Sequence, residues 1–226
     1  MVDYHIIYKM PLQSQKHGFT FENEIRAVFH LPTEANNQNT HDIPKDQNIY
    51  NSNENCSIKT SGSQTICCGD ILRFYNYNFT TEQNTIIVIL YKQTNTHKTV
   101  KNIYEINYNK ECHTKLFGNL PEEEIQKYVE GVKSIPRNIK GQEAKNIFNY
   151  LVEKKKLKNK YNNIIQINPK VDSSQSRVQC SIPNFEKNLE EFIIYKSSPD
   201  SPNTIRGGKI IQSIESCKRK RKNKLK

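Results

Sequence analysis

The stretch Asn55-Cys56-Ser57-Ile58-Lys59-Thr60-Ser61-Gly62 is the point from which the rest of the chain is interpreted. It places one apolar residue between two polar ones and closes with Ser61-Gly62, a pattern that predicts a β-strand ending in a turn. Because side chains alternate across a strand, Ser57 and Lys59 point to one face and Ile58 to the other. The strand therefore buries Ile58 and presents a polar pair on its opposite face.

A carboxylate lies upstream of this strand, in His41-Asp42-Ile43-Pro44. Ile43 anchors a short strand that Pro44 ends, which holds Asp42 beside buried structure. Asp46 is a competing acid, but it has no apolar neighbour to bury, so Asp42 is the better candidate. A lysine held beside such a carboxylate is one half of a metal-and-amine site for cutting phosphodiesters.

A helix precedes both segments. Phe21, Ile25, Val28 and Phe29 fall at i, i+4, i+7 and i+8, which predicts an amphipathic helix that closes at Pro32. Glu22 is next to Phe21, at the border of the buried stripe, where a carboxylate reaches a groove between helix and sheet. The alternative is a solvated glutamate near the start of the helix, stabilised by its dipole.

Two further strands are predicted downstream. The run Ile86-Ile87-Val88-Ile89-Leu90-Tyr91 is apolar throughout and rich in β-branched residues, which is typical of a central strand buried on both faces. Val100, Tyr104, Ile106 and Tyr108 alternate along the next strand and place one apolar face inward. With the strand at Lys59, these give a sheet of at least three strands that has helices against it.

The connection between the first two strands has its own signals. We expect Gly62 to Cys68 to form a polar turn, and Asp70 to open a short helix that reaches Tyr75. Arg73 in that helix faces either a phosphate or solvent.

The C-terminal half alternates helix and hairpin signals. Pro121 and the acids after it open a helix that runs to about Ser134. Another helix is marked by Ala144, Ile147, Phe148, Leu151 and Val152. It ends in a basic run that is either a solvated face or a phosphate-binding one, comprising Lys154, Lys155, Lys156, Lys158 and Lys160.

A hairpin follows, predicted over residues 164–167 and 178–182 across a Ser-rich loop that carries Arg177. Beyond Ser197 the chain is rich in Pro, Ser, Gly and Lys. We expect it to be flexible around Arg206-Gly207-Gly208-Lys209 and again in the tail.

Composition sets the broad class. The chain has 226 residues, an apolar fraction of 35% and a formal net charge of +11. Most of that excess lies in residues 218–226, which hold seven basic residues and no acid. A charge concentrated at one end favours a nucleic-acid partner more than the net charge alone does. No run is long enough for a membrane span and the start has no signal-peptide order, so we expect a soluble, intracellular protein.

The six cysteines include no C-x-x-C pair. With no secretory signal, free thiols are expected rather than disulfides. A zinc site built from Cys67, Cys68, Cys112 and His113 is a weaker alternative, because the ligand spacing is wrong.

The order Glu22 on a first helix, Asp42 at a strand or turn, then Ser57-Ile58-Lys59 on a strand resembles the PD-(D/E)xK nuclease superfamily. Type II restriction endonucleases and Holliday-junction resolvases belong to it. Its pattern is a helix carrying G-x-x-x-E, an aspartate, and an acid or substitute two residues before a lysine. Gly18 to Glu22 matches the helix element, Asp42 the aspartate and Lys59 the lysine. The resemblance covers roughly Gly18 to Tyr108, and nothing beyond Glu111 matches.

One position departs from the pattern, because Ser57 stands where the superfamily usually has a carboxylate. A neutral serine is a poorer ligand, so a metal ion depends more on Asp42, Glu22 and the Ile58 carbonyl. Glu54 cannot replace the missing acid if the strand reaches back that far, because its odd offset from Ser57 places it on the other face. A catalytically inactive DNA-binding relative is therefore a second interpretation.

The resemblance implies a chemistry. Mg²⁺ held by Asp42, the Ile58 carbonyl and Glu22 stabilises charge on the transition state and supplies water. Lys59 orients or deprotonates the attacking water, or stabilises the charge on the phosphate. The implied substrate is double-stranded DNA, which hydrolysis leaves with a 5′-phosphate.

Together these features predict an α+β, restriction-endonuclease-like fold, with a mixed central sheet flanked by helices and a C-terminal DNA-reading elaboration. Residues 1–110 form the nuclease core, 111–196 the helical and hairpin DNA-recognition part, and 197–226 a flexible basic tail. The expected activity is that of a Mg²⁺-dependent, site-specific DNA endonuclease. The residues expected to contact DNA are Arg73, Lys154, Lys155, Lys156 and Arg177. A palindromic site would make the protein a homodimer.

Two alternatives stay open. The chain is a non-catalytic basic DNA- or RNA-binding protein, for which Asp42, Ser57 and Lys59 are ordinary surface polar residues. Or residues 218–226 are a nuclear-import signal on an unrelated protein, which would place it in the nucleus.

Overall fold

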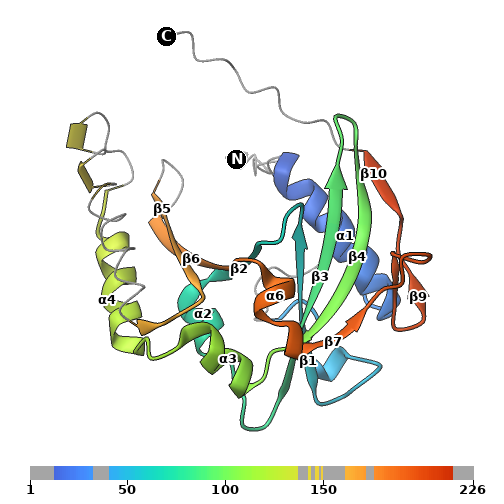
Figure 1. Ribbon diagram of the computed structural model, residues 1–226, viewed down its shortest axis with the longest axis horizontal. Coiled ribbons are helices and arrows are strands. Elements are labelled where there is room, and N and C mark those ends of the chain that lie inside the picture. Colours follow the sequence, from blue (N-terminus) through green and yellow to red (C-terminus); the bar gives the residue numbers. More distant parts are fainter. Residues whose placement is uncertain are drawn as a thin grey trace, which may run out of the picture.

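A mixed β-sheet forms the centre of the molecule, with α1 on one face and a smaller sheet and helices on the other (Figure 1). The computed structural model describes residues 13–32, 41–136, 142, 143, 146, 147, 149, 161–171 and 176–215. The α+β class and the mixed sheet flanked by helices agree with the sequence-based prediction.

The named elements in the described residues follow one another along the chain. Their bounds are α1 Gln13–Val28, η1 Lys45–Gln47, β1 Glu54–Ser61, β2 Ile66–Asp70, α2 Ile71–Tyr75, β3 Gln83–Gln93, β4 His97–Asn107, α3 Lys110–Phe117, α4 Glu122–Lys133, β5 Gln166–Val171, β6 Ser176–Ile182, α6 Phe185–Asn188, η3 Glu190–Phe192, β7 Ile193–Lys196, β8 Thr204–Ile205, β9 Gly208–Lys209 and β10 Ser213–Glu215.

The central sheet has the order β1-β3-β4-β10, and β7 also pairs with β4. The pair β1 and β3 is parallel, whereas β4 is antiparallel to β3, β7 and β10. Parallel neighbours need a long crossover, and here the chain between them contains β2 and α2. The predicted central strand is confirmed, because residues 86–90 in β3 are buried.

Alternate residues of β3 enter two different cores. Ile87 and Ile89 pack with Phe21, Ile25 and Phe29 from α1. The predicted helix stripe is therefore confirmed, apart from Val28, which is only partly buried.

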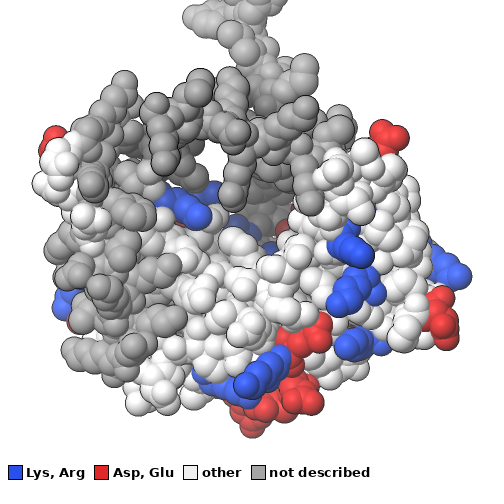
Figure 2. Space-filling view, turned by 45° about the horizontal axis from the view of Figure 1, so that its top comes forward, with Lys and Arg blue, Asp and Glu red and all other residues white. Residues whose placement is uncertain are grey.

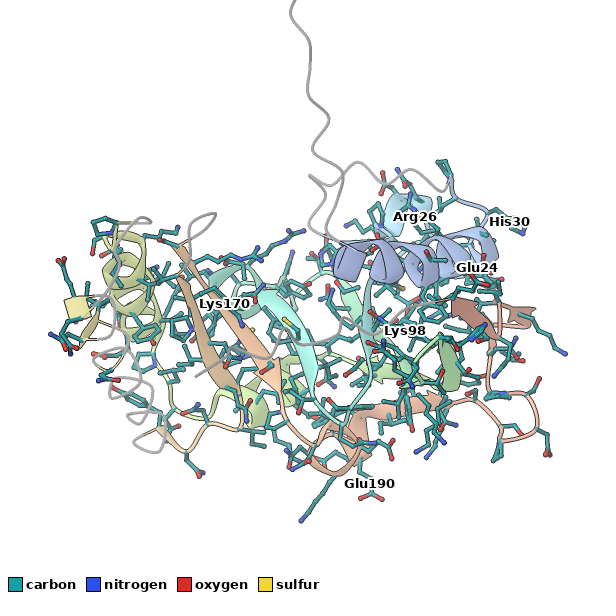
Figure 3. The ribbon with its side chains drawn as sticks, turned by 90° about the horizontal axis from the view of Figure 1, so that it is seen from above. Glu24, Arg26, His30, Lys98, Lys170 and Glu190 are labelled. Carbon is teal, nitrogen blue, oxygen red and sulfur yellow. The ribbon has the colours of Figure 1, made fainter. Side chains whose placement is uncertain are left out.

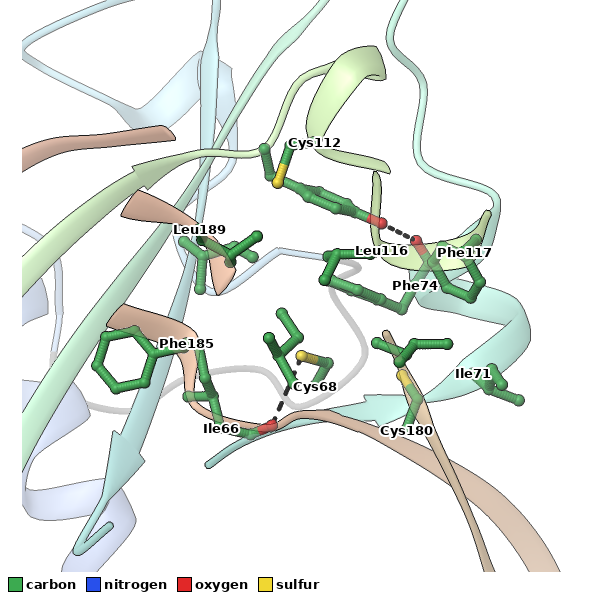
Figure 4. Close-up of a cluster of buried hydrophobic side chains, with 14 of the residues drawn as sticks. Ile66, Cys68, Ile71, Phe74, Cys112, Leu116, Phe117, Cys180, Phe185 and Leu189 are labelled. Atoms are coloured by element: carbon green, nitrogen blue, oxygen red, sulfur yellow. Dashed lines mark hydrogen bonds between the residues drawn. The ribbon is translucent and has the colours of Figure 1, made fainter. Parts of the chain in front are cut away.

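The second core lies on the opposite face of the sheet (Figure 4). Ile86, Val88 and Leu90 of β3 pack there with the small sheet and with α2, α3 and α4. Aromatic rings concentrate in it: the Phe74 ring stacks on that of Tyr108 at 4.4 Å, and the Tyr108 hydroxyl donates to the Phe74 carbonyl at 3.1 Å. Stacked and edge-to-face rings add to the stability gained by area burial.

One strand prediction is wrong in detail. Val100, Tyr104 and Ile106 were expected on a single apolar face, but Val100 belongs to the α1 core and the other two to the second core. The register of β4 against β3 shifts between Leu90 and Tyr91, where Lys101 is an extra residue. A bulge of this kind turns the following side chains to the other face, which alternation counting cannot detect.

The predicted hairpin is present as β5 and β6, which pair antiparallel and join β2 in a small sheet of order β2-β6-β5. Arg177 lies in β6 rather than in the connecting loop. The predicted polar turn from Gly62 to Cys68 is wrong at its C-terminal end, because β2 begins at Ile66. That strand exists because it pairs with β6, more than a hundred residues later, which no local pattern reveals.

The predicted helix from Asp70 to Tyr75 is confirmed, with the Asp70 carboxylate accepting a hydrogen bond from the Arg73 amide at 3.0 Å. The helix expected after Pro121 is confirmed as α4. Of the next predicted helix, residues 142, 143, 146, 147 and 149 are helical. Its basic end, with Lys154, Lys155 and Lys156, lies outside the described residues, as do residues 216–226.

The expected flexible C-terminal segment is instead packed against the sheet up to residue 215. The Ser197 amide donates to the Ile103 carbonyl at 2.9 Å, and β10 adds a strand beside β4. Arg206 makes buried ion pairs with Glu54 and Glu105. These partners are 152 and 101 residues away in sequence, so a composition rich in Pro, Ser and Gly gave no sign of them. Among the described residues, no helix is long and apolar enough to span a membrane.

Candidate active site

The site is built on the outer edge of β1. Ile43 and Cys56 exchange both main-chain hydrogen bonds, at 3.0 and 2.8 Å, in an isolated antiparallel bridge. This bridge places Asp42 beside Ile58, whose amide donates to Asp42 Oδ2 at 2.6 Å. The predicted short strand at Ile43 is thus a single bridge, and it is sufficient to fix the carboxylate.

The Lys59 ammonium contacts the same carboxylate oxygen, with 3.4 Å between Lys59 Nζ and Asp42 Oδ2. Both side chains remain partly accessible, with exposed fractions of 19% and 29%. The two residues come from different segments of the chain. This distance agrees with the sequence-based expectation that their side chains lie together.

The Ile58 main chain offers a second oxygen at this edge. In a strand, the N–H and C=O of one residue point to the same side, as Cys56 shows by bonding Ile43 with both groups. The Ile58 amide points at Asp42, so the Ile58 carbonyl faces the same edge. Ile58 itself is buried on its side-chain face, 6% exposed, which anchors the strand.

Helix α1 supplies two residues to the site. Glu22 lies near enough to Asp42 and Lys59 for both charges to act on its pKa. Arg26, one helical turn later, is buried and donates from Nε to the Pro32 carbonyl at 3.0 Å and from Nη1 to the Asp42 carbonyl. Arg26 therefore ties the Asp42 segment to the helix that carries Glu22.

The pKa values of Glu22 and Lys59 are both raised, but by different causes. Burial raises the pKa of Glu22, the Asp42 carboxylate raises it further, and Lys59 and Arg26 offset part of this effect. Burial alone would lower the pKa of Lys59, but Asp42 and other neighbours outweigh it, so the Lys59 pKa lies above its ordinary value. At neutral pH Lys59 is therefore a cation.

Ser57 lies two residues before Lys59 in β1, so the two side chains are on the same face of the strand. It is buried, 2% exposed, and its hydroxyl lies 2.9 Å from the Tyr77 hydroxyl. Tyr77 is close to Lys59, since the Lys59 charge lowers a Tyr77 pKa that burial raises overall. Ser57 is thus held by Tyr77 rather than by the Asp42 carboxylate.

His41 packs its ring edge-on against Tyr77, with 4.7 Å between centroids. Its Nδ1 is buried and has no hydrogen-bond partner among the described residues. Burial lowers the pKa of His41, and the charges of Arg73 and Lys59 lower it further while Glu82 and Asp42 oppose them. The imidazole is therefore neutral at pH 7.

The remaining sequence-predicted residues fall around or outside this centre. Arg73 is exposed on α2, near enough to act on the pKa of His41, and Arg177 is exposed on β6. Glu54 lies on the other face of β1, where Arg206 binds it, as its odd offset from Ser57 predicted. Sequence reasoning missed Arg26 and Tyr77. The signal for Arg26 was available, since an arginine four residues after Glu22 shares its helix face.

The oxygen donors fit a hard cation in kind but are few. Among the described residues, no three side chains of His, Cys, Asp or Glu are grouped to hold a metal ion. Asp42 and Glu22 offer two carboxylates, and the Ile58 carbonyl offers a third oxygen, the donor types that Mg²⁺ binds while keeping several waters. The Asp42 carboxylate raises the pKa of Glu22, and a divalent cation bound between two such carboxylates would relieve this repulsion.

Two of the alternative zinc ligands, Cys68 and Cys112, lie in the second core. Cys68 and Cys112 are buried, and burial raises the pKa of the Cys112 thiol to about 12. Cys67 is exposed on the other side of β2.

Comparison of the chain with models of protein families, with curated proteins and with solved structures gives no match. The geometry of the site therefore carries the functional argument.

Proposed function

We propose that the protein is a Mg²⁺-dependent DNA endonuclease with a restriction-endonuclease-like, PD-(D/E)xK type of core. The observation that carries this proposal is the meeting of Asp42, Lys59 and the Ile58 amide at one edge of β1, with Glu22 beside them. The Asp42 carboxylate is fixed by a main-chain amide, the Lys59 ammonium contacts it, and both side chains are partly exposed. This arrangement is suited to binding and hydrolysing a phosphate diester.

The chain's own groups divide the work. When bound, Mg²⁺ supplies positive charge for the reacting phosphate and a water of lowered pKa. The groups that would hold it are the carboxylates of Asp42 and Glu22 and the main-chain carbonyl of Ile58. Lys59, being protonated, stabilises negative charge on the phosphate or orients the attacking water, and its raised pKa disfavours a role as general base.

Ser57 supports the alternative of a non-catalytic DNA-binding protein, because its hydroxyl is neutral and is bonded to Tyr77. The distinction is testable with supercoiled plasmid DNA incubated with the purified chain and Mg²⁺. We expect nicked and linear products that disappear in EDTA.

Asp42→Asn is the decisive variant and Asp46→Asn its matched control, since Asp46 is an exposed acid four residues away in η1. Removing the Asp42 charge should reduce cleavage by about a hundredfold or more, as expected for a group that acts on the transition state. Asp46→Asn should cleave like the unaltered chain. Cleavage that survives Asp42→Asn, or no cleavage by any form, contradicts the proposal.

A further inference from the structure

The β5–β6 hairpin has one apolar and one polar face. Val178, Cys180 and Ile182 of β6 point into the second core and are fully buried. By alternation, the other face, here called the hairpin face, carries every second side chain of each strand, in the pairs 166 with 181, 168 with 179 and 170 with 177. It comprises Gln166, Asn168, Lys170, Arg177, Gln179 and Ser181.

The hairpin face combines cations with amides. Lys170 and Arg177 are directly opposite each other in the strand register, and both are exposed. Like charges at opposed positions repel, so the pair favours an anion placed between or above them. Neither strand contains an acidic residue.

Two of the three amides on this face, Asn168 and Gln166, are held by hydrogen bonds. Asn168 pairs with Gln179, and Gln166 with Ser181. The Ser181 hydroxyl accepts a hydrogen bond from Asn168 Nδ2 at 2.8 Å and donates to Gln166 Oε1 at 3.3 Å. A row of positioned amides next to two cations is the combination that binds both phosphates and base edges.

The hairpin face is connected to the candidate active site through β2. Asp70 at the end of β2 is opposite Gln179, and its carboxylate caps α2 by accepting from the Arg73 amide. Phe74 of the same helix packs its ring edge-on against Tyr77, with 5.6 Å between centroids, and Tyr77 packs against His41, the residue before Asp42. From above, β2 lies between the hairpin that carries Lys170 and the helix α1 that carries Arg26 (Figure 3).

Net charge alone does not single out this face. On the face shown in Figure 2, Lys and Arg are scattered rather than gathered in one patch, and several lie next to Asp or Glu. A cation beside an acid is a surface ion pair with little charge left for a partner. Lys170 and Arg177 differ from these ion pairs, because each has the other, a residue of the same charge, as its cross-strand neighbour.

We propose that the hairpin face is the surface on which the protein holds duplex DNA beside its active site. Lys170 and Arg177 bind backbone phosphates, and Gln166 and Gln179 reach base edges in a groove. The inference rests on the proposed function for the placement of the scissile phosphate, but DNA binding by this face is measured independently of cleavage.

The test is binding of a fluorescein-labelled 30-base-pair duplex, followed by anisotropy in EDTA so that no cleavage occurs. The variant Lys170→Ala/Arg177→Ala should bind at least about tenfold more weakly at 100 mM salt. The slope of log K against log salt should fall by about two, one for each lost phosphate contact. The matched control is Lys92→Ala/Lys101→Ala, which removes two exposed lysines of the β3–β4 hairpin and should leave both quantities unchanged.

The outcomes separate the two proposals. If the unaltered chain cleaves plasmid and the hairpin variant binds DNA normally, the hairpin face is wrong and the nuclease stands. If the hairpin variant loses binding but no form cleaves, the hairpin face stands and the nuclease is wrong. Equal weakening in the control variant, or equal competition by unlabelled duplex RNA, overturns the assignment of this face to DNA. Far-ultraviolet circular dichroism checks that both double variants are folded.

Discussion

Strand β1 carries an acid–base cluster at each end, one around Glu54 and one around Lys59. At the first, Arg206 donates two hydrogen bonds to Glu54, at 2.7 and 2.8 Å, and three to Glu105, at 2.7, 3.1 and 3.2 Å. Thr85 also donates to Glu54, at 2.5 Å. The three charged side chains are 14%, 2% and 7% exposed, in the order Arg206, Glu54 and Glu105.

The second cluster is looser and more open. Its ion pair is 3.4 Å long, and its acids include Glu22, whose pKa is raised. For Glu54, burial raises the pKa, but the hydrogen bonds from Arg206 and Thr85 outweigh it, so the pKa lies below its ordinary value. Two glutamates near one strand are thus shifted in opposite directions. A buried carboxylate with a full set of donors stabilises the fold, whereas one without them is suited to a ligand.

The largest effect is expected at the closed cluster. Arg206→Ala leaves Glu54 and Glu105 buried without a cation, which should lower the free energy of unfolding by about 3–5 kcal/mol. Urea denaturation followed by circular dichroism measures this, with Lys209→Ala as control, because Lys209 is exposed nearby on β9. A loss of under about 1 kcal/mol in Arg206→Ala would show that the cluster does not stabilise the fold.

In the open cluster, around Lys59, we expect a substitution to reduce activity much more than stability. Lys59→Ala should reduce plasmid cleavage by about a hundred- to a thousandfold, because it removes a cation that acts on the transition state. Its free energy of unfolding should change by about 1 kcal/mol or less, since the pair with Asp42 is long and partly exposed.

Denaturation and cleavage are measured on the same Lys59→Ala preparation, and Lys92→Ala serves as the control. A variant that unfolds as easily as Arg206→Ala would remove the distinction between the two clusters.

Ser57→Asp sharpens the comparison by adding the acid that the open cluster lacks. An additional carboxylate should lower the Mg²⁺ concentration for half-maximal cleavage by roughly tenfold, because Mg²⁺ affinity follows the charge of its ligands. Ser57→Ala, which also loses the bond to Tyr77, should show no such decrease. An unchanged Mg²⁺ dependence in Ser57→Asp would place this position outside the metal site.

The smallest effect concerns Glu22 and pH. A carboxyl with a raised pKa is destabilised as an anion in the folded state, so its contribution to stability is lost as the pH rises through the folded pKa. Glu22→Gln should therefore be more stable at pH 7 by roughly 0.5 kcal/mol, and the difference should vanish as the pH falls below the pKa of Glu22.

Thermal unfolding without divalent ions, measured across this pH range, checks the prediction, and Glu130→Gln on the exposed side of α4 is its control. A variant that is less stable than the unaltered chain at pH 7 would show that the Glu22 charge is favourable in the fold.

Local periodicity predicted which face of a helix or strand is buried, although the residues packed against that face come from distant segments. The spacing of Phe21, Ile25 and Phe29 fixed the buried face of α1, and the apolar run of β3 fixed the central strand. The residue types at positions 22, 42 and 59 indicated the candidate site. Two of these positions could be placed from local patterns alone, Lys59 on one face of a strand and Glu22 at the border of the buried face of a helix. The strand β2 and the packed segment around Arg206 were missed, since each is stabilised by partners over a hundred residues away.

The sequence by itself determined which faces of α1, β1 and β3 are apolar, because side-chain direction repeats with a fixed period along a helix or strand. It also determined that Ser57 and Lys59 share a face and that Glu54 does not. Only the tertiary structure decided that the Ile43–Cys56 bridge and Arg26 bring Asp42 to Lys59. The same is true of the hydrogen bond between the hydroxyls of Ser57 and Tyr77. These contacts join separate segments, and their geometry depends on how whole elements pack rather than on any local pattern.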